Sequence, residues 1–179
     1  MNRIILVYGI IAGAVAISAM TLSATLGSGS EAMSLFVGYL ILLAACSLIF
    51  VAVKRYRDRE LGGVIRFGRA ALVGLGVALV ATITYVAGWE AYLWSTDYSF
   101  FPEYTARKIE AMRAAGASAA EISSATREMA GMANLYAKFA WRVLFTFAEI
   151  MPVGLVVALI SAALLRNSRF LPARDRRPA

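Results

Sequence analysis

Three ionisable residues lie within long apolar stretches of this sequence, where charge is costly. Glu149 lies about ten residues into one stretch, and Arg142 precedes it by two helical turns on the same face. Glu90 is near the end of another stretch. A charged side chain at the centre of a membrane costs at least about 2.5–3.5 kcal/mol, so each group must be neutral, paired or in contact with water. We therefore predict a polar cluster of Glu90, Arg142 and Glu149 inside a helix bundle.

This cluster has three interpretations. Arg142 and Glu90 could extend to the membrane surface while Glu149 ties two helices together. Glu149 could instead belong to a path for protons or ions, or the cluster could bind an anionic or lipid ligand. Pro152 follows closely and predicts a helix kink near Ala148, because proline lacks a backbone donor and clashes with the preceding turn.

The usual groups of enzyme and metal sites are scarce. The sequence has no histidine, which is the commonest general base and metal ligand near neutral pH. Its one cysteine, Cys46, lies in an apolar stretch and is typical of a small packing residue. We therefore expect no catalytic residue, no metal site and no cofactor, and we interpret the chain as a protein that is not an enzyme.

Four apolar stretches organise the chain, and they cover residues 4–26, 33–53, 70–94 and 139–165. About 20 helical residues cross the hydrocarbon core of a bilayer. The stretches lack the polar stripe of a helix that faces water, and 60% of the 179 residues are hydrophobic. The sequence predicts a single-domain, all-α integral membrane protein with four transmembrane helices.

The positive charges lie mainly on one side of these stretches. Arg3, the 54–69 loop and the basic 166–179 tail hold twelve Lys and Arg residues, whereas the 95–138 segment holds five. Because short positive loops stay in the cytoplasm, we predict both termini inside and segment 95–138 outside a bacterial inner membrane. The first stretch could also be a signal peptide, although it is about twice as long as the usual apolar core of one.

The basic loop after the second stretch predicts a partner. Lys54, Arg55, Arg57 and Arg59 follow the membrane boundary directly, so we expect them to bind anionic lipid head groups. The loop lacks the lysine and spacing of a phosphate-binding loop. The net charge of +7 is explained by this location, and we expect no nucleic acid partner.

Segment 95–138 predicts an extracytoplasmic helical hairpin between the third and fourth spans. Pro102 and Glu103 suit the first turn of a helix that ends near Gly116. Ser118 and Glu121 have the spacing of a capping box at the start of a second helix. That second helix could also continue into the fourth span, since nothing between Asn134 and Trp141 breaks it.

Small residues recur at the spacing that brings membrane helices close together. Gly9 and Gly13 form a GxxxG pair, and Gly74 and Gly154 lie in similar stripes of the third and fourth stretches. We expect these residues to pack the helices of one chain against each other. Association of identical chains is the alternative.

Several short motifs resemble a bacterial inner-membrane family known as domain-of-unknown-function family 4199. They are Tyr8-Gly9 with Gly13, Tyr56-Arg57-Asp58, Gly63-Val64-Ile65-Arg66-Phe67-Gly68-Arg69-Ala70, Phe101-Pro102-Glu103-Tyr104 and the stretch from Met112 to Ile122. Residues before Pro102 are more aromatic here than is usual in the family. The resemblance covers about residues 4–165 and implies a four-span bundle in a membrane. It implies no particular activity, cofactor or catalytic residue, so none is transferred to this sequence.

These observations favour an accessory membrane protein that interacts with another membrane protein or with lipid. The alternative is a small oligomeric transporter or proton-linked carrier that uses Glu149 and Pro152. Few polar residues line the stretches and the two halves show no convincing inverted repeat, which argues against transport. A membrane enzyme is the third hypothesis, and the lack of histidine or paired carboxylates disfavours it.

Overall fold

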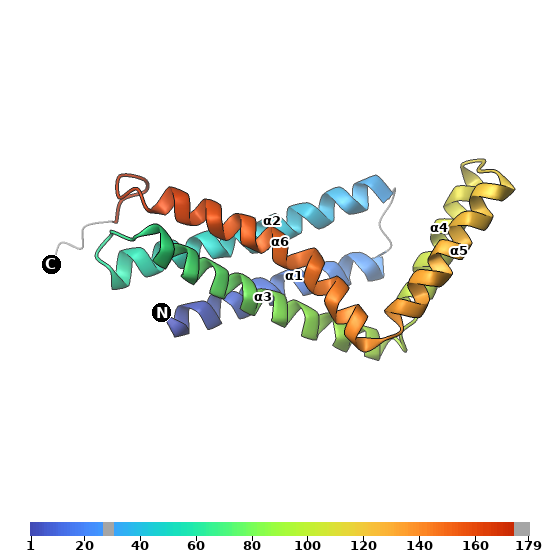
Figure 1. Ribbon diagram of the computed structural model, residues 1–179, viewed down its shortest axis with the longest axis horizontal. Helices are drawn as coiled ribbons and strands as arrows, with labels where there is room; N and C mark the ends of the chain where they lie inside the picture. Colours follow the sequence, from blue (N-terminus) through green and yellow to red (C-terminus); the bar gives the residue numbers. More distant parts are fainter. Residues whose placement is uncertain (27–30, 174–179) are drawn as a thin grey trace. The chain divides into compact units, whose positions relative to one another are not determined.

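The computed structural model describes residues 1–26 and 31–173, without the side chains of residues 23–26, 31–39 and 42. Within these residues the chain is entirely helical, with six helices and no strand (Figure 1). The helices are α1 (Asn2–Leu26), α2 (Glu31–Glu60), α3 (Phe67–Ser95), α4 (Phe100–Ala114), α5 (Ala119–Tyr136) and α6 (Phe139–Leu165). The all-α prediction is confirmed. Residues 27–30 of the predicted outer turn and 174–179 of the predicted tail lie outside the described residues.

The helices extend beyond most of the apolar stretches. Helix α2 continues past residue 53 to Glu60, and α3 begins at Phe67 rather than at residue 70. A helix can continue into polar residues when these residues have sufficient helix propensity. The end of an apolar stretch therefore indicates where the membrane boundary lies, but not where the helix ends. Gly62 and Gly63 end α2, because both have positive φ angles and the Gly63 N–H donates to the Arg57 carbonyl.

The chain divides into two compact units. Unit 1 consists of Met1–Gly88 with Phe147–Ala179, and unit 2 consists of Trp89–Thr146. Helices α3 and α6 each contribute residues to both units.

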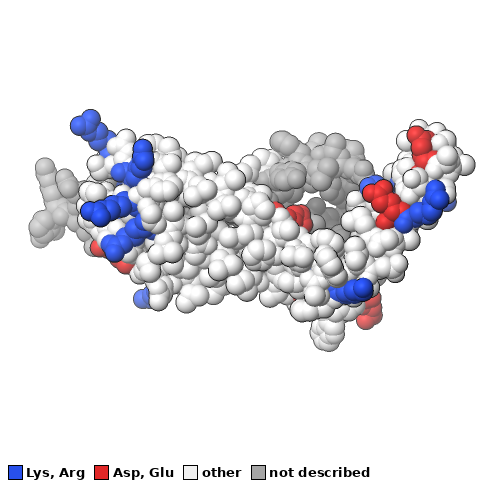
Figure 2. Space-filling view, viewed as in Figure 1, with Lys and Arg blue, Asp and Glu red and all other residues white. Residues whose placement is uncertain are grey.

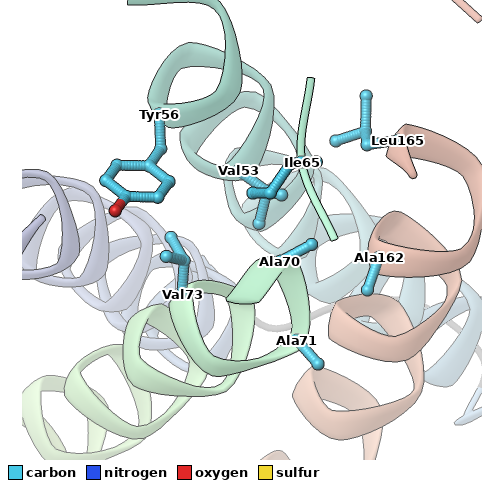
Figure 3. Packing of buried hydrophobic residues seen from close by; sticks show 8 residues of the cluster. All are labelled: Val53, Tyr56, Ile65, Ala70, Ala71, Val73, Ala162 and Leu165. Carbon is cyan, nitrogen blue, oxygen red and sulfur yellow. The ribbon is translucent and has the colours of Figure 1, made fainter. Parts of the chain in front are cut away.

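Four helices form the core of unit 1. At the end near the α2–α3 loop, the buried apolar side chains come from α2, the loop, α3 and α6 (Figure 3). They are Val53, Tyr56, Ile65, Ala70, Ala71, Val73, Ala162 and Leu165. A second cluster from α2, α3 and α6 lies around Ile49, Val77 and Ala158. Side chains of α1, including Ile4 and Ile5, pack against both clusters.

Small residues bring these helices close together. A Cβ atom built on Gly13 would lie 2.5 Å from the carbonyl oxygen of Ala81, and one on Gly9 would lie 2.5 Å from Cβ of Val80. These two glycines of α1 therefore contact the backbone and side chains of α3. On another face of α3, Gly74 lies against Ala158 of α6, and Gly154 of α6 lies against Ala78 of α3. All four predicted packing glycines thus serve contacts within one chain.

Unit 1 carries large apolar side chains on its outer surface. Among the described residues, three helical segments are long and apolar enough to cross a membrane, namely Asn2–Leu22 of α1, Phe67–Ser95 and Phe139–Leu165. The exposed side chains include Leu6, Val7, Ile10, Ile11 and Val15 of α1, Leu72, Leu79 and Ile83 of α3, and Val156, Leu159 and Ile160 of α6. A water-soluble bundle would place polar groups at such positions. The predicted second span lies in α2, where many side chains are outside the described set.

Helices α4 and α5 of unit 2 pack against each other. Helix α4 is terminated by Gly116, which has a positive φ of 79°. The N–H of Ala117 donates to the Met112 carbonyl, as in a Schellman motif at a helix C-terminus. The Ser118–Glu121 capping box is confirmed in both directions. Hydrogen bonds from the hydroxyl and N–H of Ser118 lower the pKa of the Glu121 carboxyl below its ordinary value.

Candidate functional site

Unit 2 contains a largely buried ion pair, formed by Glu90 and Arg142. The Arg142 Nε and Nη2 atoms each donate to one carboxylate oxygen of Glu90, at 2.7 Å in both cases. The Glu90 side chain is 18% exposed and the Arg142 side chain is 6% exposed. This two-pronged geometry is the strong form of an arginine–carboxylate contact. It joins the end of α3 to the beginning of α6.

Aromatic rings surround the Arg142 guanidinium. Its Cζ atom lies 4.9 Å from the centre of the Tyr98 ring, 6.0 Å from that of Tyr136 and 5.9 Å from that of Phe139. Such contacts stabilise a cation more when water is excluded. Tyr98 has a φ of 57° and follows Asp97 at 49°, which is uncommon for residues with a side chain. The turn between α3 and α4 therefore adopts a strained backbone where Tyr98 contacts the guanidinium.

Arg142 also occupies the break between α5 and α6. Its Nη1 atom donates to the carbonyls of Tyr136 and Ala137, at 3.1 and 3.5 Å. These carbonyls would accept backbone N–H groups if the helix continued. The alternative prediction that the second hairpin helix continues into the fourth stretch is wrong, because α5 ends at Tyr136 and α6 begins at Phe139. The sequence contains no helix breaker there, and the arginine side chain supplies the missing donor.

A cluster of rings extends from this ion pair. Trp89 donates a hydrogen bond of 2.8 Å to the Tyr136 hydroxyl, and the Tyr136 ring stacks on Phe101. Trp89 also contacts Phe100 edge to face. Tyr98 and Tyr136 are not among the site residues predicted from the sequence. Their contact with Arg142 depends on the turn geometry, and no sequence signal indicates it.

Glu149, the third member of the predicted cluster, belongs to unit 1. Its side chain is exposed on α6, and it has no hydrogen-bond or ion-pair partner among the residues that the structure describes. The structure therefore shows the Glu90–Arg142 pair, while the three-residue cluster stays a prediction. Pro152 lies within α6, which continues to Leu165. The Ala148 carbonyl consequently lacks the backbone donor that residue 152 would supply in a regular helix.

Arg57 does not fit the predicted role of binding lipid head groups. Its side chain is fully buried, at 0% exposure. The Nε atom donates to Asp58 at 2.7 Å, Nη1 donates to the carbonyls of Phe170 at 2.9 Å and Leu165 at 3.4 Å, and Nη2 donates to the Leu171 carbonyl. Arg57 is buried because it follows Ile49 and Val53 at intervals of four residues, which places it on the buried face of α2. This spacing was the sequence signal that could have revealed its position.

The other residues of the predicted head-group loop differ in their contacts. Lys54 forms an ion pair with Asp58 one turn later. Arg55 is exposed and donates to the Tyr8 hydroxyl at 3.1 Å. Arg59 is exposed and has no partner within the described part of the chain. Partial burial raises the pKa of the Asp58 carboxyl, but the hydrogen bonds from Arg57 and Lys54 outweigh it, so that the pKa is lower than usual.

No group of three or more potential metal ligands occurs in the described ranges. Cys46 is buried in the second core cluster, as a packing residue would be.

A family model described as a protein of unknown function, DUF4199, matches residues 7–167. The match covers most of the chain. No curated protein and no solved structure matches it.

Proposed function

This chain belongs to DUF4199, a family of proteins of unknown function, and we propose that it is a four-span accessory protein of a bacterial inner membrane. The observation that carries this proposal is the outward-facing set of apolar side chains on α1, α3 and α6. Such a surface is stable in hydrocarbon and would associate or aggregate in water.

The fourth span of the proposal is α2. Its sequence between residues 33 and 53 contains no charged residue, and its length exceeds that of a bilayer-spanning helix. Cys46, Ile49 and Ala52 of α2 pack with α3 and α6, so α2 shares the core of the helices that are apolar enough to span. Because α2 packs with helices that are apolar enough to span a membrane, we expect α2 to lie in the membrane with them.

Orientation follows from the charges. Lys and Arg side chains gather at the end of unit 1 that holds the α2–α3 loop, whereas its helical middle carries none on the face that Figure 2 shows. By the positive-inside rule this end would face the cytoplasm. The α4–α5 pair would then form the extracytoplasmic hairpin.

The accessory role rests on the hairpin and on the lack of histidine in the sequence. In α4 and α5 the buried residues are Ile109 and Met129, and most other side chains are exposed. Met132 and Leu135 are exposed apolar residues of α5. Polar helices with a few exposed apolar side chains are suited to contact a partner protein.

Purification in mild detergent tests this proposal. The chain is expected in the membrane fraction after an alkaline carbonate wash and to co-purify with a stoichiometric membrane-protein partner. Met132→Glu with Leu135→Glu should release the partner, whereas Arg107→Gln with Lys108→Gln, which also makes the hairpin more negative by two charges, should not. A homo-oligomer that is pure and conducts ions in liposomes would contradict the accessory role.

A proton-linked carrier is the second candidate, and it is favoured specifically by Glu149, which has no partner among the residues that the structure describes. A carboxylate without a partner in an apolar helix can exchange protons with water in a cavity. Pro152 frees a backbone carbonyl one turn away, which adds a polar group near it. Glu149→Gln should abolish proton flux in liposomes if this candidate is right, and Glu128→Gln on α5 is the control. Equal flux with both variants would exclude a role for Glu149.

A further inference from the structure

The buried Arg57 joins two segments that are far apart in the sequence. Its guanidinium donates to carbonyls of Leu165, Phe170 and Leu171, which belong to the end of α6 and the turn that follows it. Exposed carbonyls of such a turn would ordinarily be satisfied by water. The single arginine side chain therefore holds the turn after α6 against the end of α2.

Independent contacts place the same two segments together. The ring of Phe170 packs edge to face on Phe50 of α2, at 6.4 Å between centres. A Cβ atom on Gly63 would lie 3.2 Å from Cβ of Ala173. Ile65 of the α2–α3 loop and Leu165 of α6 belong to one buried cluster (Figure 3). The turn is thus packed on the loop and not merely tied to it by one side chain.

Both segments carry exposed arginines that have no acidic partner among the described residues. We call this set the arginine surface. It consists of Arg59, Arg66 and Arg69 from the α2–α3 region, and Arg166 and Arg169 from the turn after α6. The two acids of this region are already paired, Asp58 with Arg57 and Lys54 and Glu60 with the N-terminal amine of Met1. The surface therefore has an excess of positive charge, and Figure 2 shows Lys and Arg side chains gathered at this end of unit 1.

We propose that Arg57 is a positioning residue that assembles these two arginine-bearing segments into one binding surface for the phosphate of an anionic lipid head group. The inference rests on the proposed membrane location. A lipid is favoured over free phosphate because exposed apolar side chains alternate with the arginines in both segments. Val64 and Phe67 accompany Arg66, and Leu171 follows Arg169. Such side chains would contact acyl chains while the guanidinium groups hold the phosphate.

The test uses the purified full chain in neutral detergent, titrated with phosphatidylglycerol, with native mass spectrometry to count bound lipids. Two double variants, Arg59→Gln/Arg66→Gln and Arg166→Gln/Arg169→Gln, each remove two charges from one segment. Each arginine near an anionic lipid contributes about fivefold in affinity. If one lipid contacts both segments, each double variant should weaken the same single binding event, and the combined variant should weaken it by about the product of the two separate losses. Two independent sites would leave one lipid bound at its original affinity in each double variant and would overturn the proposal.

Arg57→Lys provides the positioning test, since it keeps the charge but cannot donate to all these carbonyls. It should reduce lipid affinity as much as Arg166→Gln/Arg169→Gln does, and it should have no further effect in that background. An additional loss in that background would show that Arg57 acts otherwise. If Arg57→Lys does not fold, the two double variants above still decide the proposal.

Two controls separate the possible failures. Arg107→Gln/Lys108→Gln removes equal charge from α4 and should leave lipid binding unchanged. Inorganic phosphate at millimolar concentration should not displace the lipid, and displacement would assign the surface to free phosphate instead. A chain that resists carbonate extraction but binds no anionic lipid would refute only this inference, whereas a chain released by carbonate would refute the membrane proposal itself.

Discussion

Arg142 contacts groups from three segments at once, so we expect its loss to cost most in unit 2. It pairs with Glu90, donates to two carbonyls at the α5–α6 break and contacts the ring of Tyr98. Removing it leaves a poorly hydrated carboxylate and two carbonyls without donors. The cost of leaving such groups unpaired exceeds the net gain of making the pair.

We expect Arg142→Gln to lower the free energy of unfolding by about 3 kcal/mol. The measurement is unfolding in mixed micelles followed by tryptophan fluorescence, because Trp89 is hydrogen-bonded to Tyr136 in the same cluster. Arg107→Gln is the control, since its contact with Glu103 is 4.0 Å long and both side chains are about 60% exposed. It should change stability by less than about 1 kcal/mol. Equal effects of the two variants would contradict the proposed importance of the buried pair.

Helix ends and helix contacts depend on local features that can be tested element by element. The start of α5 is held by a reciprocal pair of hydrogen bonds between Ser118 and Glu121. Because these bonds favour the ionised carboxylate, the pKa of Glu121 is lower in the folded protein than its ordinary value of 4.5. The capping contribution is therefore complete above pH 4.5 and is lost as the pH falls through the lowered value.

An NMR titration of the Glu121 carboxyl in the full protein should give a midpoint below 4.5. Ser118→Ala removes the hydroxyl and should move the midpoint back toward 4.5, with fraying of the first turn of α5. A midpoint that is the same in both proteins would show that the capping box does not form in solution.

The contact of α1 with α3 leaves no room for a methyl group. Gly13→Ala should destabilise the protein by about 1–3 kcal/mol, because the new Cβ would lie 2.5 Å from the Ala81 carbonyl oxygen. Gly131→Ala in α5 is the matched control, since a Cβ there has nothing within 4 Å, and helix propensity should make it stabilising by up to about 1 kcal/mol. Both can be measured by thermal unfolding in detergent. Stabilisation by Gly13→Ala would mean that α1 does not pack closely on α3.

At the scale of the whole molecule, the proposed topology predicts which side of the membrane each loop faces. In a Cys46→Ala background, Arg107→Cys should react with an impermeant maleimide on intact cells, and Arg59→Cys should react only after permeabilisation. Both positions are exposed on the protein, so a difference in their reaction with the maleimide would be caused by the membrane and not by burial. Labelling of Arg59→Cys on intact cells, with Arg107→Cys protected, would show that the protein has the opposite orientation in the membrane.

The apolar stretches, the capping box and the glycine stop after α4 were predictable because each depends on residues a few positions apart. Hydrophobic composition selects the environment, and neighbouring side chains satisfy the ends of helices. The roles of Arg57 and Arg142 depend on partners 108–114 and 52 positions away in the chain. A sequence pattern does not specify which distant carbonyl or carboxylate a buried guanidinium will meet, because helix packing brings those groups together. The membrane character of this protein therefore follows from local composition, whereas the burial of Arg57 and the break before Arg142 follow from how the helices pack.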